Sequence, residues 1–434
     1  MNIAPPSLSK AASCFLCACS RWFLWLLLPL LLTGCLIPIS EFKRTEYNYD
    51  PKYGVEDPQF LRSMQTLRTG IRAGNKVELL ENGDGLFPRM LEDIKNATQT
   101  INLEVYIFDD GKVGIEFVNA LCEQAKRGVE VRVLVDDWGS RLNKQEARLK
   151  QAGVKFYIYK PVKLYSLQHV EHRTHRKLLM VDGKIGYCGG FGFDDRWLGN
   201  ARNRDEWRDL AVRIEGPVVA TMQNIFHEDW LHTTGEVLHG NGHFPAIPLT
   251  GEILAQAIGS SRTDQASIAK LMIYMAIQSA RKRISIDNAY FVPDKQIRRA
   301  LMRAAQRGVD VRVVVPGKNI DLPYVRLASR FYQKELLETG VKIYEYEPTM
   351  LHTKAMVVDG VWSTIGSINF LARSFRKNAE ANMLIYDYGF AAKVEKAITE
   401  DIQKSRQITL DECKKRGPCE RLRELWSSLL SENY

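Results

Sequence analysis

One eight-residue pattern, H-x-K-x-x-x-x-D, occurs twice in this chain of 434 residues. Its first copy runs from His175 to Asp182 and its second copy from His352 to Asp359. The neighbouring sequence repeats as well, because RGVEVRV at residues 127–133 is echoed by RGVDVRV at residues 307–313. A single repeat with so long a period indicates two copies of one domain rather than a solenoid of short units.

The length and the 45% hydrophobic content allow two substantial cores and argue against a disordered chain. Strand and helix patterns alternate from Lys76 onward, which predicts an α/β fold: two tandem, pseudo-symmetric domains, each a mixed β-sheet flanked by helices. The expected strands are 77–80, 101–108, 130–135, 284–287, 310–315 and 342–346, and the expected helices are 86–97, 114–126, 267–280, 295–307 and 324–338. We place the domains at residues 76–243 and 249–405, with the proline-marked stretch 244–248 as their boundary.

The first 35 residues differ in kind from the rest. Lys10 and Arg21 precede an apolar stretch at residues 22–32, and no acidic residue occurs before Glu41, which predicts an export signal. Leu-Thr-Gly-Cys at residues 32–35 resembles a bacterial lipoprotein signal, in which Cys35 would be acylated. An uncleaved membrane anchor is the alternative, although a bilayer span needs about 20 apolar residues. Residues 36–75 are polar and turn-rich and predict a tether that holds the domains at the bacterial envelope, facing the periplasm.

Charge and cysteine content add weaker constraints. The net charge of +9 suits anionic phospholipid or nucleic acid, and charge alone does not choose between them. Cys122 and Cys188 are expected in the core, whereas Cys413 and Cys419 could pair in an oxidising compartment. Residues 406–434 form a basic tail, for which a solvated helix packed on its own domain is favoured over a membrane-surface helix.

Each motif ends in an Asp-Gly pair between two apolar runs, which predicts a tight hairpin turn. The histidine and lysine before that turn are then expected on a strand. Residues i and i+2 of a strand point to the same face, so His175 would lie beside Lys177 and His352 beside Lys354. Asp182 and Asp359 complete the set of catalytic candidates, but a structural role in the turn is favoured for them over proton transfer.

Two imidazoles and two ammonium groups in one pocket suit a phosphodiester. The lysines can neutralise the non-bridging oxygens, while one histidine attacks phosphorus and the other transfers a proton to the leaving alcohol and from the incoming one. This charge balance requires no metal, and the sequence predicts no other cofactor. A metal cluster of His169, His172 and His175 is disfavoured, because such a ligand set needs a fourth group and a defined geometry.

The paired motifs resemble the phospholipase D superfamily, and more closely its bacterial cardiolipin synthase branch, over residues 76–400. The resemblance implies an active site at the domain interface, with His175 as nucleophile and His352 as general acid and base. It also implies phosphate contacts from Ser367 and Asn369, whereas the first copy has Gly192 where the asparagine would fall. By the same alignment, Asp209 is expected to hydrogen-bond the far nitrogen of His175, and Glu380 that of His352.

The sequence therefore predicts a phosphatidyltransferase that makes cardiolipin, with anionic phospholipids as substrates and a membrane surface as partner. A phospholipase D is the main alternative, because water rather than a lipid hydroxyl could resolve the same phosphohistidine. A periplasmic nuclease is a second alternative, although the membrane anchor and the two motifs in one chain disfavour nucleic acid. A degenerate binding module is a third, which the intact motifs disfavour. The oligomeric state is not determined by these patterns.

Overall fold

The computed structural model describes residues 46–67, 69–161, 172–260 and 268–431. Residues from Tyr47 onward belong to one compact unit. Cys35 and the whole expected signal sequence lie outside the described residues, as do residues 36–45 of the expected tether and His169.

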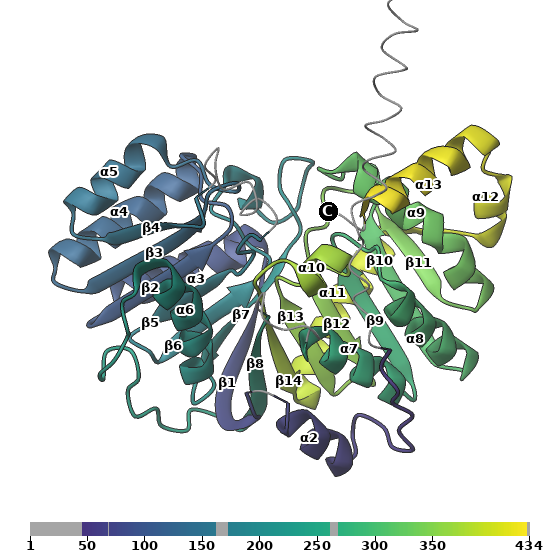
Figure 1. Ribbon diagram of the computed structural model, residues 1–434, viewed down its shortest axis with the longest axis horizontal. Coiled ribbons are helices and arrows are strands. Elements are labelled where there is room, and N and C mark those ends of the chain that lie inside the picture. The colour runs from purple at the N-terminus through teal and green to yellow at the C-terminus, as the bar shows by residue number, and fades with distance from the viewer. Residues whose placement is uncertain (1–45, 68, 162–171, 261–267, 432–434) are drawn as a thin grey trace, which may run out of the picture. The chain divides into compact units, whose positions relative to one another are not determined.

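The strands of the described chain form one 15-stranded sheet in the order β15-β11-β10-β9-β12-β13-β14-β8-β1-β7-β6-β5-β2-β3-β4 (Figure 1). The first half contributes β1 (Arg72–Glu81), β2 (Thr100–Val105), β3 (Glu130–Asp136), β4 (Lys155–Tyr159), β5 (Leu178–Val181), β6 (Ile185–Gly189) and β7 (Leu210–Glu215). The second half contributes β8 (Ile253–Ser260), β9 (Arg283–Asn288), β10 (Asp310–Pro316), β11 (Lys342–Tyr346), β12 (Lys354–Val358), β13 (Trp362–Gly366), β14 (Glu380–Tyr386) and β15 (Ser405–Gln407).

The strand order is pseudo-symmetric about the central pair β1 and β8, which run antiparallel. On either side of this pair, the order β1-β7-β6-β5-β2-β3-β4 corresponds to β8-β14-β13-β12-β9-β10-β11. Strands β2, β3 and β4 are parallel to one another, as are β9, β10 and β11, whereas the inner strands and the edge strand β15 pair antiparallel, so each half is a mixed sheet. The predicted α/β class is confirmed, and the two halves share one continuous sheet.

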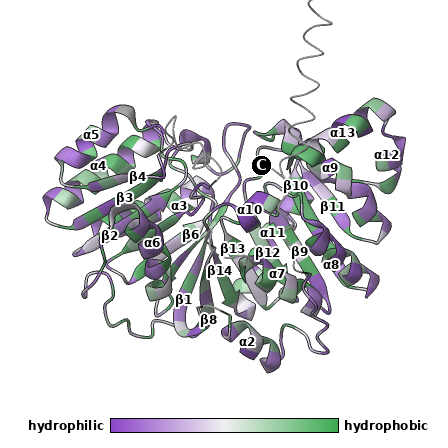
Figure 2. Ribbon diagram, in the orientation of Figure 1, coloured by the Kyte–Doolittle hydropathy of each residue, from purple (hydrophilic) through white to green (hydrophobic). Residues whose placement is uncertain are grey.

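Helices cover both faces of the sheet. They are α2 (Pro58–Gln65), α3 (Asn82–Lys95), α4 (Lys112–Lys126), α5 (Asn143–Gln151), α6 (Val219–Thr234), α7 (Ile268–Ser279), α8 (Lys295–Gln306), α9 (Pro323–Glu338), α10 (Ala372–Arg376), α11 (Tyr388–Gln403), α12 (Leu410–Lys415) and α13 (Pro418–Ser431). Helices α3 and α4 pack in a core of the first half, and α7 and α8 in a core of the second. A third core joins α6 and α11 to strands of both halves. Figure 2 shows the strands largely hydrophobic, as burial between two helical layers requires.

The expected tether is wrong for residues 47–75. Helix α2 buries Phe60 and Met64 completely against the core of the second half. The ring of Tyr47 lies 5.4 Å from that of Tyr274 on α7, and the Arg281 guanidinium donates to the Pro51 carbonyl at 2.8 Å. The aromatic residues that looked like part of a polar linker therefore cover α7, which is apolar over most of its circumference.

The expected basic tail is folded. Helices α12 and α13 pack on α9 (Figure 1), so this segment packs on its own half. Cys413 is buried and Cys419 exposed, and both are free thiols, so the possible disulfide between them is absent. Cys122 and Cys188 are buried free thiols, as expected for core positions.

Candidate active site

Each motif ends in a tight turn, as the Asp-Gly pairs predicted. Asp182 and Gly183 have φ of 52° and 62°, and Asp359 and Gly360 have φ of 53° and 72°. Two successive positive φ values are typical of the type I′ turns that close hairpins. The strand assignment before these turns needs correction: β5 begins at Leu178 and β12 at Lys354, so both histidines lie in extended segments just before their strands.

The two motif aspartates fasten the hairpin to the sheet. The Asp182 carboxylate accepts hydrogen bonds from the backbone amides of residues 98, 99 and 100, at 2.8–3.2 Å. The Asp359 carboxylate does the same for the amides of residues 281, 282 and 283, at 2.7–2.9 Å. Burial alone would raise the pKa of Asp182, but these donors hold it below its usual value. Each carboxylate, five residues beyond its lysine, therefore ties the turn to the sheet, which fits the structural role that the sequence favoured for it.

The two histidine segments cross into opposite halves. The His175 amide donates to the Ala379 carbonyl at 2.8 Å, and the His352 amide donates to the Arg208 carbonyl at 2.7 Å. Each crossing places the imidazole beside a carboxylate of the other half. His175 Nδ1 lies 2.9 Å from Glu380 Oε2, and His352 Nδ1 lies 2.8 Å from Asp209 Oδ2. Both carboxylates contact a histidine, as expected, but the pairing is the reverse of the one that the alignment predicted: Glu380 contacts His175, and Asp209 contacts His352.

This exchange brings both motifs into one site. Because each Nδ1 faces a carboxylate, Nε2 is the imidazole nitrogen that remains for other contacts. Lys177 Nζ donates to the His175 carbonyl at 2.7 Å, and Lys354 Nζ lies 3.1 Å from His352 Nε2. Both lysines are 2% exposed, and the charges of Glu380, Lys354 and Asp209 all act on Lys177. Two imidazoles, two ammonium groups and two carboxylates thus share one electrostatic environment.

Burial sets the protonation states of this site. It lowers the pKa of Lys177 to about 7 and that of Lys354 to about 8, with the neighbouring carboxylates opposing the shift. It lowers the pKa of His352 to about 3, helped by Lys354, and lowers the pKa of His175 against the attraction of Glu380. Burial would raise the pKa of Asp209 and Glu380, but the adjacent histidines hold both below their usual values. Burial thus favours the neutral form of both imidazoles, which is the form that attacks phosphorus or accepts a proton.

The two histidines have different surroundings. The His175 side chain is 12% exposed, and the ring of Tyr106 lies 5.1 Å away, edge-on. The His352 side chain is 5% exposed and is surrounded by Trp197 at 5.1 Å, Trp207 at 5.2 Å and Tyr290 at 6.2 Å between ring centres. His175 is thus the more accessible of the two.

The motif extensions differ between the halves in a way that sequence reasoning did not foresee. The Ser367 hydroxyl donates to Glu380 Oε2 at 2.5 Å and thereby orients the carboxylate that contacts His175, while its expected contact with phosphate stays a prediction. In the first half a Cβ on Gly190 would lie 2.4 Å from Asp209 Oδ1, and one on Gly192 would lie 3.1 Å from the Trp197 ring. The Trp197 indole N–H donates to Asp209 Oδ2 at 2.9 Å in place of a serine hydroxyl.

Asn369, the second expected phosphate contact, is 3% exposed. Its Oδ1 has no hydrogen-bond partner among the described residues. Trp197 was missed at the sequence level. The available signal was Gly192 itself, because losing an asparagine side chain leaves room that a large neighbour can fill.

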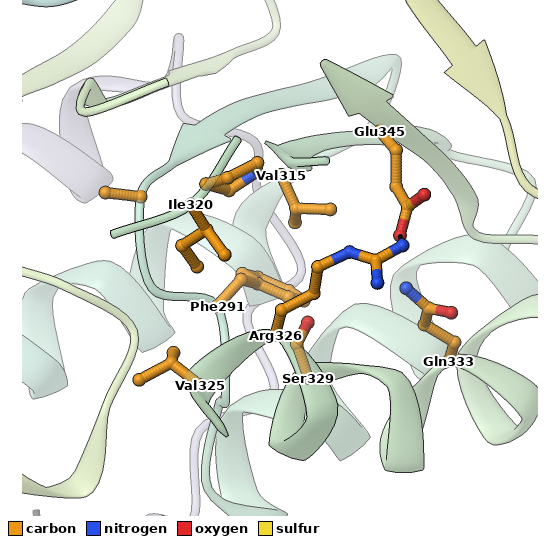
Figure 3. A pocket seen from close by; sticks show the side chains of 10 residues that line it. Phe291, Val315, Ile320, Val325, Arg326, Ser329, Gln333 and Glu345 are labelled. Carbon is orange, nitrogen blue, oxygen red and sulfur yellow. Dashed lines mark hydrogen bonds and ion pairs between the residues drawn. The ribbon is translucent and has the colours of Figure 1, made fainter. Parts of the chain in front are cut away.

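Neither a metal cluster nor the cavity of Figure 3 adds to this site. No group of three or more metal-ligating side chains occurs within the described ranges, and His172 Nδ1 lies 3.1 Å from the Lys377 carbonyl. The small cavity of Figure 3, about 10 Å³, lies between α9 and strands β10 and β11. The ion pair between Arg326 and Glu345 borders it at 2.8 Å, and none of its lining residues belongs to either motif.

Comparisons with known proteins agree with this geometry. A family model described as "Cardiolipin synthase, PLD-like domain" matches residues 90–230 and 273–402. A probable cardiolipin synthase of Bacillus subtilis is 34% identical over 385 residues, which cover 87% of this chain and 77% of that protein. The chain belongs to this family. A cardiolipin synthase of Geobacillus sp. is 36% identical over 84% of this chain and 73% of its own length.

Family membership confirms the predicted phospholipase D-like fold and the expectation of a phospholipase D-type phosphatidyltransferase. The crystal structure of phosphatidylserine synthase from Haemophilus influenzae shares the fold, with a TM-score of 0.67 and 16% identity over 86% of this chain and 99% of that one. In the portion of the chain with described structure, no helix is long and apolar enough to span a bilayer.

Proposed function

We propose that this protein makes cardiolipin from two phospholipids through a phosphohistidine intermediate. The observation that carries the proposal is the exchanged pairing of the two histidines with Glu380 and Asp209, which places both imidazoles and both lysines in one buried site. That set supplies one nucleophile, one proton carrier and two cations, which are the groups a phosphodiester exchange requires.

In the first half-reaction, His175 Nε2 attacks the phosphorus of a phosphatidyl donor. The bond from phosphorus to the headgroup oxygen breaks, and His352 Nε2 supplies the proton that the departing alcohol requires. With phosphatidylglycerol as donor, the departing alcohol is glycerol. Glu380 supports the positive charge that develops on His175, and the lysines neutralise the non-bridging oxygens.

In the second half-reaction, a glycerol hydroxyl of another phospholipid enters where the first alcohol departed. His352 takes its proton, the new oxygen–phosphorus bond forms, and the bond to His175 breaks. His352 must hold a proton in one half-reaction and lose it in the other. Its low pKa in the empty site rises when an anionic phosphate binds nearby, because a negative charge favours the imidazolium.

The role of nucleophile falls to His175 because of its greater exposure, 12% against 5% for His352. His352, closed in by three aromatic rings, suits the proton carrier, because water is kept from it. The same groups would hydrolyse the donor to phosphatidic acid if water reached the phosphohistidine. The names of the relatives favour a lipid acceptor over water and over a nucleic acid substrate.

A mixed-micelle assay with labelled phosphatidylglycerol tests the proposal. We expect cardiolipin and free glycerol from the purified protein and neither from His175→Ala or His352→Ala. Phosphatidic acid as the sole product would replace the transferase with a hydrolase. Failure to turn over lipid, together with cleavage of DNA, would favour the nuclease.

Envelope anchoring is part of the same proposal and is tested separately. Cys35 would carry the acyl chains of a periplasm-facing lipoprotein. Metabolic labelling with radioactive palmitate should label the wild type and leave Cys35→Ser unlabelled. Equal labelling of both proteins would exclude acylation at this cysteine.

A further inference from the structure

Helix α13 packs on the protein through its polar side. Its buried side chains are Glu424, Ser427 and Ser428, which are 3%, 8% and 3% exposed. Glu424 lies 3.1 Å from Arg330 Nε on α9 and 3.3 Å from Arg416 Nη1. An amphipathic helix on a soluble protein normally turns its apolar side inward and its charged side outward. The orientation of α13 is therefore reversed.

The outward side of α13 is apolar. Its five large residues are Leu422, Leu425, Trp426, Leu429 and Leu430, and their exposed fractions are 54%, 38%, 61%, 56% and 51%. Their spacing of i, i+3, i+4, i+7 and i+8 forms a single stripe along the helix. A contiguous apolar surface of this kind, rimmed by polar residues, marks an interaction site.

The charges around the stripe indicate what covers it. Successive helical residues are rotated by about 100°, which places Arg421 and Arg423 on the two opposite edges of the stripe. Lys414 and Lys415 are exposed just before the helix, on α12. Glu420 is bound instead to Arg330 on α9. An apolar stripe with a tryptophan and basic edges fits an anionic lipid surface, and two such stripes would bring like charges together.

The helix runs toward the active site. Gln333 on α9 accepts from Arg416 at 2.5 Å, whereas Arg330, one turn earlier on α9, binds Glu420 and Glu424 farther along the chain. The two helices are therefore antiparallel, side by side in Figure 1. Helix α9 begins just after Asp321, whose carboxylate accepts from Tyr290 at 2.8 Å beside His352.

The first half has an exposed aromatic residue near its own motif. Trp138 is 55% exposed, and its amide donates to Asp136 at 2.9 Å. The same aspartate accepts from the Thr174 amide at 3.1 Å, next to His175. Exposed apolar side chains thus occur near the motif in each half.

We propose that α13 is an interfacial helix, which inserts its apolar stripe into an anionic phospholipid surface and presents the active site to lipid headgroups. The proposal deepens the proposed function, and it rests on that function in taking a phospholipid as the substrate. Lipid contact through α13 would not require the N-terminal signal, because α13 belongs to the same compact unit as the active site.

Photocrosslinking from the full-length chain tests the contact directly. Trp426→p-benzoylphenylalanine is compared with Tyr388→p-benzoylphenylalanine, because Trp426 and Tyr388 are both 61% exposed. Tyr388 begins α11, next to Asp387, whose amide donates to the Val361 carbonyl beside the second motif turn. In phosphatidylglycerol vesicles with alkyne-tagged acyl chains, we expect several-fold more lipid adduct at position 426. Equal adducts at both positions, or crosslinks at 426 to a second copy of the chain, would overturn the proposal.

An activity measurement separates this proposal from the proposed function. We expect Leu429→Ser to lower turnover of phosphatidylglycerol in vesicles about tenfold and to leave turnover of a monomeric, short-chain phosphatidylglycerol unchanged. Tyr388→Ser is the matched control and should change neither. Equal losses on both substrates would contradict the interfacial role. If the wild type converts no lipid at all, the proposed function fails, and the crosslinking result still decides whether α13 contacts lipid.

Discussion

The two halves of the protein repeat one motif but support it differently. In the second half, Ser367 holds Glu380, and Glu380 holds His175, which is the more exposed histidine. In the first half, Gly190 leaves room for the Asp209 carboxylate and Gly192 for the Trp197 ring. The Trp197 indole N–H binds Asp209, and Asp209 contacts His352 among the aromatic rings. The comparison teaches that duplication preserved the reacting groups while the residues behind them diverged. It also explains how two identical side chains can take different roles.

Replacing either histidine should cause the largest loss of activity and test whether the two histidines have different roles. Each substitution, His175→Ala and His352→Ala, should lower cardiolipin formation by about 10⁴-fold or more, because each removes a group that both half-reactions need. Radiolabelled phosphatidylglycerol distinguishes the roles, since only His352→Ala should still acquire an alkali-stable phosphoenzyme label. A label retained by His175→Ala instead would exchange the two assignments. His227→Ala, which lies on α6 outside the site, is the control.

The carboxylates should give the next largest effect. Asp209→Asn and Glu380→Gln should each lower kcat by about 10³-fold, because a neutral amide cannot support an imidazolium. The exchanged pairing assigns Glu380 to His175 and Asp209 to His352. Rapid-quench measurement of phosphoenzyme formation should therefore show a slower build-up in Glu380→Gln. If phosphoenzyme formed more slowly in Asp209→Asn but not in Glu380→Gln, the contact between Glu380 and His175 would not predict which carboxylate supports the nucleophile.

The lysines should set the alkaline limit of activity. The pKa of Lys177 is lowered to about 7 and that of Lys354 to about 8, so their ammonium groups lose protons as the pH rises through this range. Deprotonation removes the charge that neutralises phosphate, and kcat/KM should fall by about tenfold per pH unit above the lower value. Lys177→Arg stays charged and should move the alkaline limb of the pH profile upward. An unchanged limb would assign it to another group.

The smallest effect should come from the residues behind the carboxylates. Trp197→Phe keeps the ring but removes the N–H that binds Asp209, and Ser367→Ala removes the hydroxyl that binds Glu380. Each should lower kcat by about tenfold, the scale of one hydrogen bond to a charged group. The two losses should fall on different half-reactions in rapid-quench experiments. If both substitutions slowed the same half-reaction equally, Trp197 and Ser367 would not support separate roles for His352 and His175.

Sequence reasoning named the candidate catalytic residues because they are marked by local spacing. The H-x-K pattern placed His175 and His352 as candidates, and the Asp-Gly pairs predicted the turns that Asp182 and Asp359 occupy. It failed where an interaction joins residues far apart in the chain. Nothing local indicates that His175 contacts Glu380 rather than Asp209, since that choice depends on how the two halves meet. Trp197 and the packing of residues 47–67 on the second half were missed for the same reason.

The duplication, the α/β class and the candidate histidines and lysines could be read from the sequence, because these depend on spacing, periodicity and side-chain type within short segments. Only the tertiary structure decided which carboxylate serves which histidine, which surroundings make the histidines unequal, and which side of α13 faces outward. These outcomes depend on the pairing of β1 with β8, which joins the two halves into one continuous sheet and so fixes where the two motifs lie relative to each other. Contacts of that range are fixed by packing, and packing is a property of the whole fold rather than of any one segment.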